Sequence, residues 1–186
     1  MTRRHPLLTV DGERRPGDDD DDDDDDDDGV TVPSWVGVVV SIHVSAPHPP
    51  GQRGAPLVPL EVAELVQGKG IVGDKRFSPR TKVANQITLV EEEALLAAST
   101  AAKLTLAPGE SRRNVVTRGV ALNHLVGRRF VVGAAVVQGI ELCEPCGHLA
   151  KLTSEELRAA LVHRGGLRCQ IVTSGLCRAG DPIRLS

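Results

Sequence analysis

Two cysteines and a histidine lie close together in the run Cys-Glu-Pro-Cys-Gly-His at 143–148. An apolar segment leads up to Cys143, and Pro145 and Gly147 are residue types that favour a turn. This pattern predicts that Cys146 lies on a loop at the end of a strand. An exposed thiolate in such a place can bind a ligand or a soft metal. The stretch is therefore the candidate centre of chemistry.

Three kinds of chemistry fit a Cys-x-x-Cys pair. A structural zinc site needs further ligands, and the candidates show neither a second Cys-x-x-Cys nor a His-x₃-His spacing; they are His148, His163, Cys169 and Cys177. A thiol–disulfide oxidoreductase needs a strand–helix crossover around the pair, which the flanking sequence lacks. A thiolate that binds a soft metal or carries sulfur needs only Cys146. Burial as a small apolar residue is the competing interpretation for Cys143, and Cys169 and Cys177 are expected to be packing residues.

Basic residues elsewhere in the chain could bind an anion beside this thiolate. Arg112, Arg113 and Asn114 precede a predicted strand, and guanidinium groups bind phosphate or carboxylate through two parallel hydrogen bonds. A solvated basic edge is the alternative interpretation. Arg164, which precedes two glycines, could be a second anion contact or the cation at a helix C-terminus.

Asp74 and Arg76 follow a glycine-rich run, Gly-Lys-Gly-Ile-Val-Gly at 68–73, and could form an ion pair that holds this loop. The run has the letters of the dinucleotide-binding Gly-x-Gly-x-x-Gly. However, the polar segment 74–84 contains Pro79 and offers no strand–turn–helix unit around it. A nucleotide-binding loop of this kind is therefore not predicted.

The composition favours one small domain built on aliphatic residues. The chain has 186 residues, is 40% hydrophobic and only 2% aromatic, and valine arrives in short runs typical of strands. Asp18–Asp28 are eleven consecutive aspartates, so the rest of the chain is basic although the formal net charge is −3. A basic domain without aromatic platforms suits a small anionic ligand better than a nucleic acid.

The same features bear on the location of the protein. Four cysteines in a chain without an apolar signal segment favour a reducing, cytoplasmic compartment. No apolar run approaches the roughly 20 residues of a membrane span, so no membrane partner is expected.

Hydrophobic periodicity predicts many short strands and few helices. Helices are expected over 91–103 and from Thr153 or Ser154 onward. The expected strands cover 35–44, 58–63, 86–90, 128–132, 134–142, 168–173 and 183–185. This order predicts a mainly β or α+β fold, a partly closed barrel over 30–186 with a few short helices. Residues 1–29 are predicted to be a disordered acidic extension that makes the chain more soluble, rather than a segment that binds a basic partner.

The chain resembles a single-domain member of the MOSC family, named for the C-terminal part of molybdenum-cofactor sulfurase. The resemblance extends over 38–185, and the order and spacing of its motifs make it specific. The motifs are Val-Val-Ser-Ile-His at 39–43, Gly-Lys-Gly-Ile-Val-Gly-Asp-Lys-Arg at 68–76, Gln-Ile-Thr-Leu-Val-Glu at 86–91, Ser-Arg-Arg-Asn-Val-Val-Thr-Arg-Gly at 111–119, Leu-Asn-His-Leu-Val-Gly at 122–127, Cys-Glu-Pro-Cys-Gly-His-Leu at 143–149, His-Arg-Gly-Gly-Leu at 163–167 and Gly-Asp-Pro at 180–182.

The resemblance implies a β-barrel and a molybdenum cofactor (molybdopterin) whose metal is held by the Cys146 thiolate. Arg113, Asn114 and Arg164 are the implied contacts of its phosphate and pterin, and Asp74 and Arg76 complete the implied cofactor-binding set. Related proteins reduce N-hydroxylated compounds, and the family is also associated with pyridoxal phosphate binding. An alternative is a non-catalytic module that carries sulfur as a persulfide on Cys146.

Two further expectations follow from the resemblance. The chain has no flavin or iron–sulfur motif, so a reductase of this kind needs an external electron donor protein. The usual Asp-Arg-Tyr or Asp-Arg-His is replaced by Asp-Lys-Arg-Phe at 74–77, and the loop 78–84 is lengthened. The contacts on the substrate side of this loop are therefore expected to differ from those of relatives.

Overall fold

The computed structural model describes residues 35–47, 57–106 and 109–186. The predicted acidic extension over 1–29 lies outside the described residues, and so does the beginning of the domain expected over 30–186. Segment 48–56 of the proline-rich loop is also outside them.

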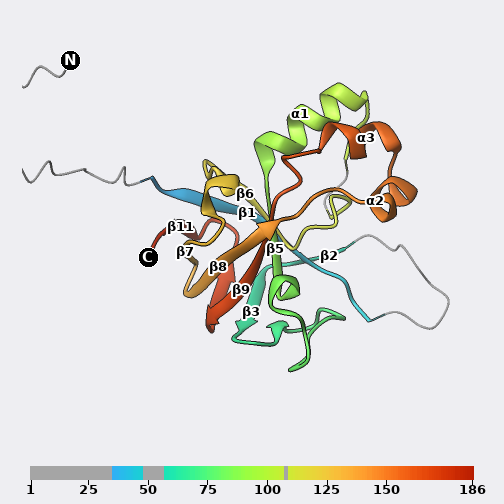
Figure 1. Cartoon of the computed structure of the whole chain (residues 1–186). Helices are drawn as coiled ribbons and strands as arrows, with labels where there is room; N and C mark the ends of the chain where they lie inside the picture. Colours follow the sequence, from blue (N-terminus) through green and yellow to red (C-terminus); the bar gives the residue numbers. More distant parts are fainter. Residues whose placement is uncertain (1–34, 48–56, 107–108) are drawn as a thin grey trace, which may run out of the picture. The chain divides into compact units, whose positions relative to one another are not determined.

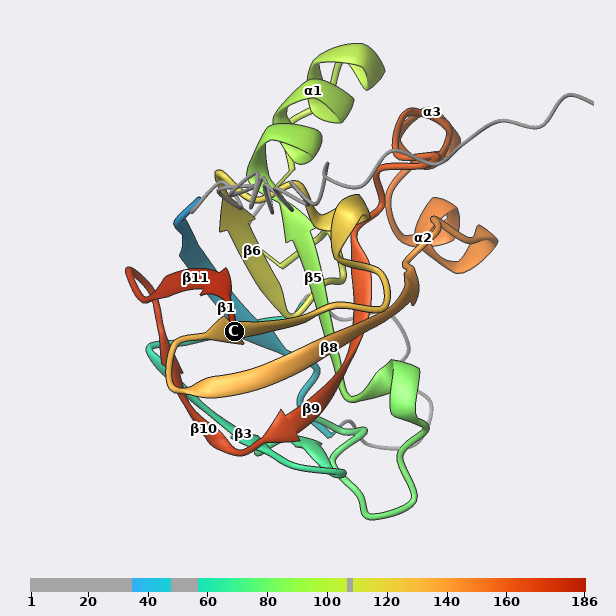
Figure 2. The ribbon, with the colours of Figure 1, turned by 60° about the vertical axis from the view of Figure 1, so that its left-hand side comes forward.

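Seven strands form a β-barrel (Figures 1 and 2) in the order β11-β7-β8-β9-β5-β6-β1. The ring is closed by a short pairing of β1 with β11, in which Gly37 lies opposite Ile183 and Val38 opposite Pro182. The strands are β1 (Gly37–Val44), β5 (Ile87–Glu91), β6 (Val115–Arg118), β7 (Arg129–Val132), β8 (Ala135–Leu142), β9 (Leu167–Thr173) and β11 (Pro182–Leu185). The predicted mainly β fold with a barrel and few short helices is confirmed.

The remaining strands are not part of the seven-stranded ring. β2 (Val58–Leu60) pairs with β1, whereas β3 (Val62–Val66) forms a separate sheet with β4 (Gly70–Ile71) and β10 (Gly175–Arg178). The single strand expected over 58–63 is therefore wrong, because the chain passes from one sheet to the other at Glu61. The barrel interior is filled by buried valine, leucine and isoleucine, together with Phe130, as the low aromatic content predicted.

One parallel pair distinguishes the barrel. β5 and β6 run in the same direction, and α1 (Glu92–Ala102) belongs to the crossover between them. Their register places Leu89 beside Val115, and β9 and β8 continue the row with Leu167 and Leu142. At this level β6 and β9 begin and β8 ends. The segments that adjoin these strands, 111–114, 143–146 and 163–166, are therefore brought close together.

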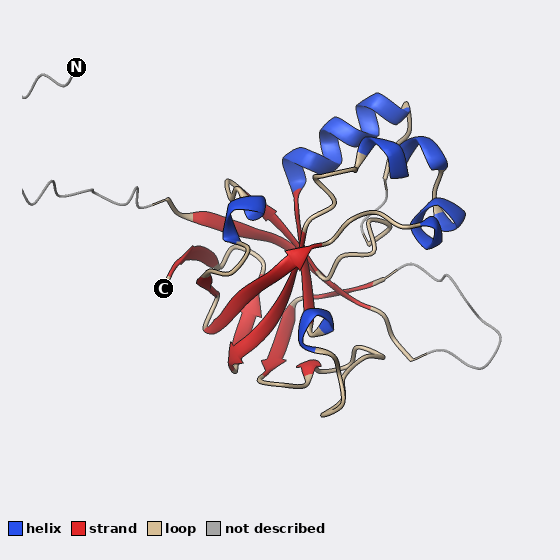
Figure 3. Cartoon of the chain, in the orientation of Figure 1, coloured by secondary structure: helices blue, strands red, loops and turns tan. Residues whose placement is uncertain are grey.

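Three helices lie together on one side of the barrel (Figures 1 and 3). They are α1, α2 (Gly147–Leu152) and α3 (Glu155–Ala160), and Ala98, Leu149, Leu157 and Leu161 form their shared apolar cluster. The predicted cap is confirmed, since the Ser154 hydroxyl accepts a hydrogen bond from the Leu157 amide at 3.1 Å. The helix α2 directly after Cys146 was not predicted. Two 3-10 turns, η1 (Val83–Asn85) and η2 (Leu122–Leu125), complete the described elements.

The described helices are all too short or too polar to span a membrane.

Candidate functional site

An open pocket of about 130 Å³ lies where two of these segments, 111–114 and 143–146, meet the residues 74–76 that follow the glycine-rich run. Five of the six residues predicted for the site line it: Asp74, Arg76, Arg113, Asn114 and Cys146. The other lining residues are Ser45, Leu57, Lys75, Asn85, Gln86, Thr88, Arg112, Cys143, Glu144, His148, Leu149 and Arg168. The structure does not bring Arg164 to this pocket.

Cys146 is the exposed cysteine of the four, since Cys143, Cys169 and Cys177 are buried. It is the N-cap residue of α2. The pKa of the Cys146 thiol is lowered mainly by a hydrogen bond from the backbone N–H of Leu149. The N–H of His148 and the charge of Arg113 lower this pKa further. Burial raises it, but by less than the Leu149 N–H lowers it. Cys146 is therefore the side chain in the pocket best suited to act as a soft thiolate ligand.

Cys169 and Cys177 lie in the barrel interior, where the pKa of a thiol is raised rather than lowered. Burial raises the pKa of Cys177 to about 12 and raises that of Cys169 well above its ordinary value. Their predicted role as packing residues is confirmed by their burial. Cys143 is 3% exposed, and its polar contacts described below are made by its backbone amide and carbonyl.

We expect iodoacetamide to alkylate Cys146 with a midpoint pH below that of a cysteine in an unstructured peptide. The reason is that its lowered pKa increases the thiolate fraction at neutral pH. Peptide mass mapping after timed alkylation of the folded protein measures the rate at each cysteine. Cys169 serves as the buried control and should react only after denaturation. A midpoint at or above the ordinary thiol pKa would contradict this assignment.

Arg113 is a buried cation that joins two of the segments around the cysteines. Its side chain is 7% exposed, and all of its described contacts are carbonyl oxygens. Its Nε donates to Gly165 O at 2.7 Å, Nη2 to Cys143 O at 2.8 Å and Nη1 to Ser111 O at 3.3 Å. Burial lowers the pKa of Arg113, but a guanidinium remains protonated at neutral pH. It therefore supplies positive charge near Cys146 and also holds the loop in place.

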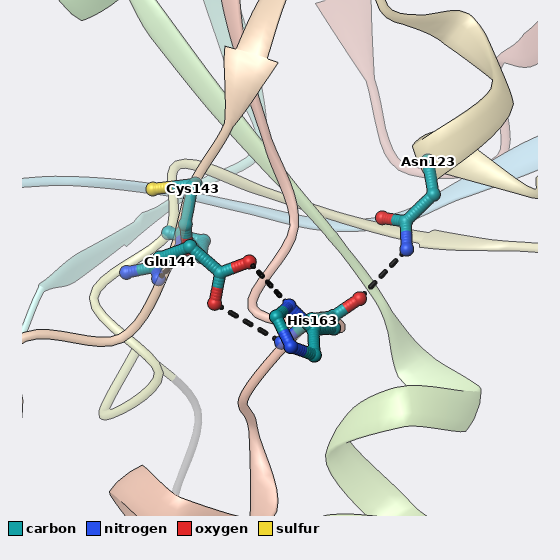
Figure 4. A network of polar contacts seen from close by, with 5 residues as sticks. Asn123, Cys143, Glu144 and His163 are labelled. Atoms are coloured by element: carbon teal, nitrogen blue, oxygen red, sulfur yellow. Dashed lines mark hydrogen bonds and ion pairs between the residues drawn. The ribbon is translucent and has the colours of Figure 1, made fainter.

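The turn at 163–166 holds the first half of the Cys-x-x-Cys loop. The Cys143 amide donates to Gly166 O at 2.7 Å, and a Cβ on Gly165 would come within 2.5 Å of Cys143 O. Glu144 accepts a hydrogen bond from the His163 amide at 3.0 Å, and its other oxygen lies 3.3 Å from His163 Nδ1 (Figure 4). A side chain at position 165 would collide with the Cys143 carbonyl, which explains why this residue is a glycine.

Arg164 belongs to the same turn, but its side chain has a different place. Its Nε donates to Ala160 O at 2.6 Å, at the end of α3. Asn123 reaches the turn from η2, where its amide donates to His163 O at 2.7 Å (Figure 4). The contacts of Arg164 match the alternative interpretation of a cation at a helix C-terminus.

Asn114 is fully used in internal hydrogen bonds. Its Oδ1 accepts from the amide and the hydroxyl of Thr88, at 3.1 and 2.8 Å, and its Nδ2 donates to His43 O at 3.1 Å and to Asp74 Oδ2 at 3.4 Å. An amide side chain has no further strong sites. Asn114 therefore positions neighbouring segments of the pocket wall.

Asp74 has a similar internal role in the glycine-rich loop. Its Oδ2 accepts from the Ser45 amide at 2.9 Å and its Oδ1 from the Arg76 amide at 2.8 Å. The predicted Asp74–Arg76 contact thus runs through the backbone of Arg76. The guanidinium of Arg76 is exposed at the pocket.

The pocket carries an excess of positive charge. Five of its lining residues are lysine or arginine and two are carboxylates, and both carboxylates have the internal partners described above. Arg168 is held by Asn85 Oδ1 at 2.6 Å and by Glu141 at 3.5 Å. Such a pocket favours an anionic ligand.

No group of three or more His, Cys, Asp or Glu side chains in the described ranges is placed to hold a metal ion. A structural zinc site therefore has no ligand set in this part of the chain. A metal bound at Cys146 would have to arrive with most of its own ligands.

The sequence over most of the barrel matches the model of a known family. The model of the MOSC domain matches residues 72–184. The chain belongs to the MOSC domain family. The match includes the Cys-x-x-Cys loop and the segment 111–114 of this MOSC domain, so the predicted family membership is confirmed. None of the curated proteins compared with the chain matches it.

Solved structures show the same fold. The crystal structure of YuaD from Bacillus subtilis gives a TM-score of 0.66 at 18% identity and covers 81% of this chain and 97% of that chain. The crystal structure of YiiM from Geobacillus stearothermophilus gives a TM-score of 0.63 at 19% identity and covers 81% of this chain and 75% of that chain. The crystal structure of YiiM from Escherichia coli gives a TM-score of 0.55 at 18% identity and covers 80% of this chain and 69% of that chain. At these identities the likeness shows a shared fold alone.

Sequence reasoning did not assign Ser45, Lys75 or Arg168 to the site of this MOSC domain. Arg168 had a usable signal, since it is a cation beside Leu167 at the start of a strand whose apolar residues alternate. Ser45 directly follows strand β1, and no local sequence pattern marks it as a pocket residue. Its place depends on contacts with residues about thirty positions away in the sequence.

Proposed function

We propose that this MOSC domain holds a molybdenum cofactor through the Cys146 thiolate and reduces N-hydroxylated compounds. The observation that carries the proposal is the position of Cys146, an exposed thiol with a lowered pKa in a basic pocket. The family association with this cofactor supports it.

The residues present fit a phosphorylated pterin that brings a metal with its own sulfur ligands. The pocket offers one soft ligand, Cys146, and cations for a phosphate, of which Arg113 and Arg76 are the proposed contacts. The molybdenum would supply two-electron redox chemistry when bound. Because Asn114 and Asp74 are committed internally, we assign them to positioning the pocket wall.

The reaction removes oxygen from nitrogen. An N-hydroxylated amine takes up two electrons and two protons, its N–O bond breaks, and the amine and water are formed. The electrons come from an external redox protein. In this scheme Cys146 would bind the metal through its thiolate sulfur, and Arg113 balances the thiolate charge. The Glu144–His163 contact holds the loop between the cysteines.

A reductase assay tests the proposal. The full chain, produced in cells that make the cofactor, is reduced with methyl viologen and supplied with N-hydroxycytidine, and the cytidine formed is measured by chromatography. We expect turnover by the wild type and background rates for Cys146→Ser. The exposed variant Arg128→Gln, outside the pocket, is the matched control and should keep the wild-type rate. Stoichiometric molybdenum without turnover would contradict the reductase proposal.

A second candidate, a sulfur carrier, rests on the same exposed low-pKa thiol. In that case Cys146 would hold a persulfide passed from a sulfur donor protein, and no substrate would be reduced. Intact-mass spectrometry under non-reducing conditions should then show an added sulfur atom that dithiothreitol removes. An unmodified wild type after incubation with a cysteine desulfurase and cysteine would exclude this function.

A further inference from the structure

A second pocket, of about 330 Å³, lies between α1 and the outer face of strands β1 and β6. Ile42 and Val115 belong to the barrel core. The residues after them in the strands, His43 and Val116, point to the opposite face and line this pocket. None of its described lining residues lines the pocket at Cys146. They are Val40, Ser41, His43, Glu92, Leu95, Leu96, Ser99, Leu106, Ser111 and Val116.

The walls of the second pocket are mainly apolar. Five of its described lining residues are leucine or valine, and Leu96 is 63% exposed, so the pocket is open to solvent along α1. The charged group in the described wall is the carboxylate of Glu92, which is paired with Arg118 Nε at 2.6 Å. An engineered apolar cavity of about 150 Å³ takes up benzene. The second pocket therefore has room for two fused rings.

His43 brings a buried imidazole to this wall. The residue is 1% exposed, and its Nδ1 has no hydrogen-bond partner among the described residues. Burial lowers the pKa of His43, so the ring is neutral at pH 7 and carries one donor and one acceptor nitrogen. A buried polar atom without a partner destabilises a fold. A ligand that forms a hydrogen bond with this nitrogen would remove that cost.

The backbone of His43 is fixed on both sides by Asn114. The His43 amide donates to Asn114 O at 2.6 Å, and the His43 carbonyl accepts from Asn114 Nδ2 at 3.1 Å. These bonds hold the residue in β1 and leave the ring little freedom to move toward another partner. The imidazole is thus presented to the second pocket in a fixed position.

We propose that the second pocket binds a small, uncharged and mainly apolar molecule that carries a hydroxyl group, such as a phenol, with this hydroxyl hydrogen-bonded to Nδ1 of His43. The leucine and valine side chains remove the apolar part of the ligand from water. The carboxylate of Glu92 disfavours an anionic ligand. The site is independent of the cofactor and of the reductase function proposed above.

Two probes that differ only in the hydroxyl test the site. Fluorescence titration of the full chain measures the affinity for 2-naphthol and for naphthalene. We expect 2-naphthol to bind about fivefold more tightly, because its hydroxyl pairs with the buried nitrogen. His43→Phe keeps a planar ring without the nitrogen and should remove this preference. In the wild type, 2-naphthol but not naphthalene should shift the Nδ1 resonance of His43 in proton–nitrogen correlation spectra.

Three further variants locate the binding. Leu96→Glu adds a charge to the apolar wall and should weaken the binding of both probes at least about tenfold. Ala97→Glu is the matched control, because this exposed neighbour on α1 lies outside the pocket, and it should bind both probes as the wild type does. Cys146→Ser should keep the affinity for 2-naphthol, because Cys146 belongs to the other pocket.

Four results would overturn the proposal. Equal affinity for the two probes, or an unchanged Nδ1 resonance, would show that His43 does not bind the hydroxyl. Loss of 2-naphthol binding in Cys146→Ser would place the ligand in the cysteine pocket. A full chain that binds neither probe would show that the second pocket is not available to a ligand.

Discussion

Arg113→Met should destabilise the folded protein by about 3 kcal/mol and loosen the cysteine loop. The substitution leaves three carbonyls, those of Ser111, Cys143 and Gly165, without the donor that they share. Each unpaired buried carbonyl costs about 1–3 kcal/mol, and the removal of a desolvated charge offsets part of the sum. Urea denaturation followed by circular dichroism measures the free energy of unfolding.

Two further variants separate the effects of hydrogen bonding and charge. Arg113→Lys keeps the charge but cannot serve three carbonyls in fixed directions. We expect it to be destabilised while the pKa of the Cys146 thiol stays low, whereas Arg113→Met should raise that pKa. Arg164→Met is the matched control, because its guanidinium has one described hydrogen bond, and it should change the free energy of unfolding by less than about 0.5 kcal/mol. Equal stability of Arg113→Met and Arg164→Met would contradict the claim that the three hydrogen bonds of Arg113 stabilise the cysteine loop.

Cys146→Ala should reduce the molybdenum content of the purified protein to background. The described residues offer no other group of side chains able to hold the metal, so nothing replaces the lost thiolate. Inductively coupled plasma mass spectrometry gives the metal-to-protein ratio, and fluorescence of the oxidised pterin gives the cofactor content. Both should fall together.

Cys143→Ala is the control for this loss. Its side chain is buried, and removal of the sulfur should cost about 1 kcal/mol while the carbonyl that binds Arg113 remains. Molybdenum should therefore stay near the wild-type level. Equal loss from both variants would indicate a site that needs the paired cysteines and would contradict the assignment to Cys146 alone.

Local sequence patterns were sufficient to place most of the barrel and the thiolate. The valine-rich runs correspond to strands β1, β7 and β8, alternating apolar residues mark β9, and the Ser154 cap marks the start of α3. Pro145 and Gly147 correctly indicated that Cys146 is exposed. These features depend on neighbouring residues, which a single sequence displays.

The roles of the polar residues could not be read in the same way. Arg113 had the pattern of an anion clamp, yet the alignment of Leu89, Val115, Leu167 and Leu142 across four strands turns it toward backbone carbonyls. Asn114 is saturated by partners on three other segments for the same reason. Such contacts follow from strand register over long sequence distances, and hydrophobic periodicity does not specify that register.

Arg164 and α2 illustrate a second limit. The motif His-Arg-Gly-Gly brings the turn to the cysteine loop, but within it the backbone of His163 and the two glycines make the contacts, whereas Arg164 caps α3. Arg164 is the immediate neighbour of both His163 and Gly165, yet its side chain points to a different part of the structure. The helix α2 is six residues long and is held by the apolar cluster that it shares with α1 and α3, rather than by a strong local helix signal.

X-ray absorption at the molybdenum edge tests the central claim most directly, because it counts the sulfur atoms bound to the metal. The measurement compares the cofactor-loaded wild type with Cys146→Ser, reconstituted with the same cofactor. We predict that the wild type has one more sulfur neighbour than the variant, in which an oxygen takes the place of the thiolate. The same sulfur count in both proteins would contradict ligation of molybdenum by Cys146.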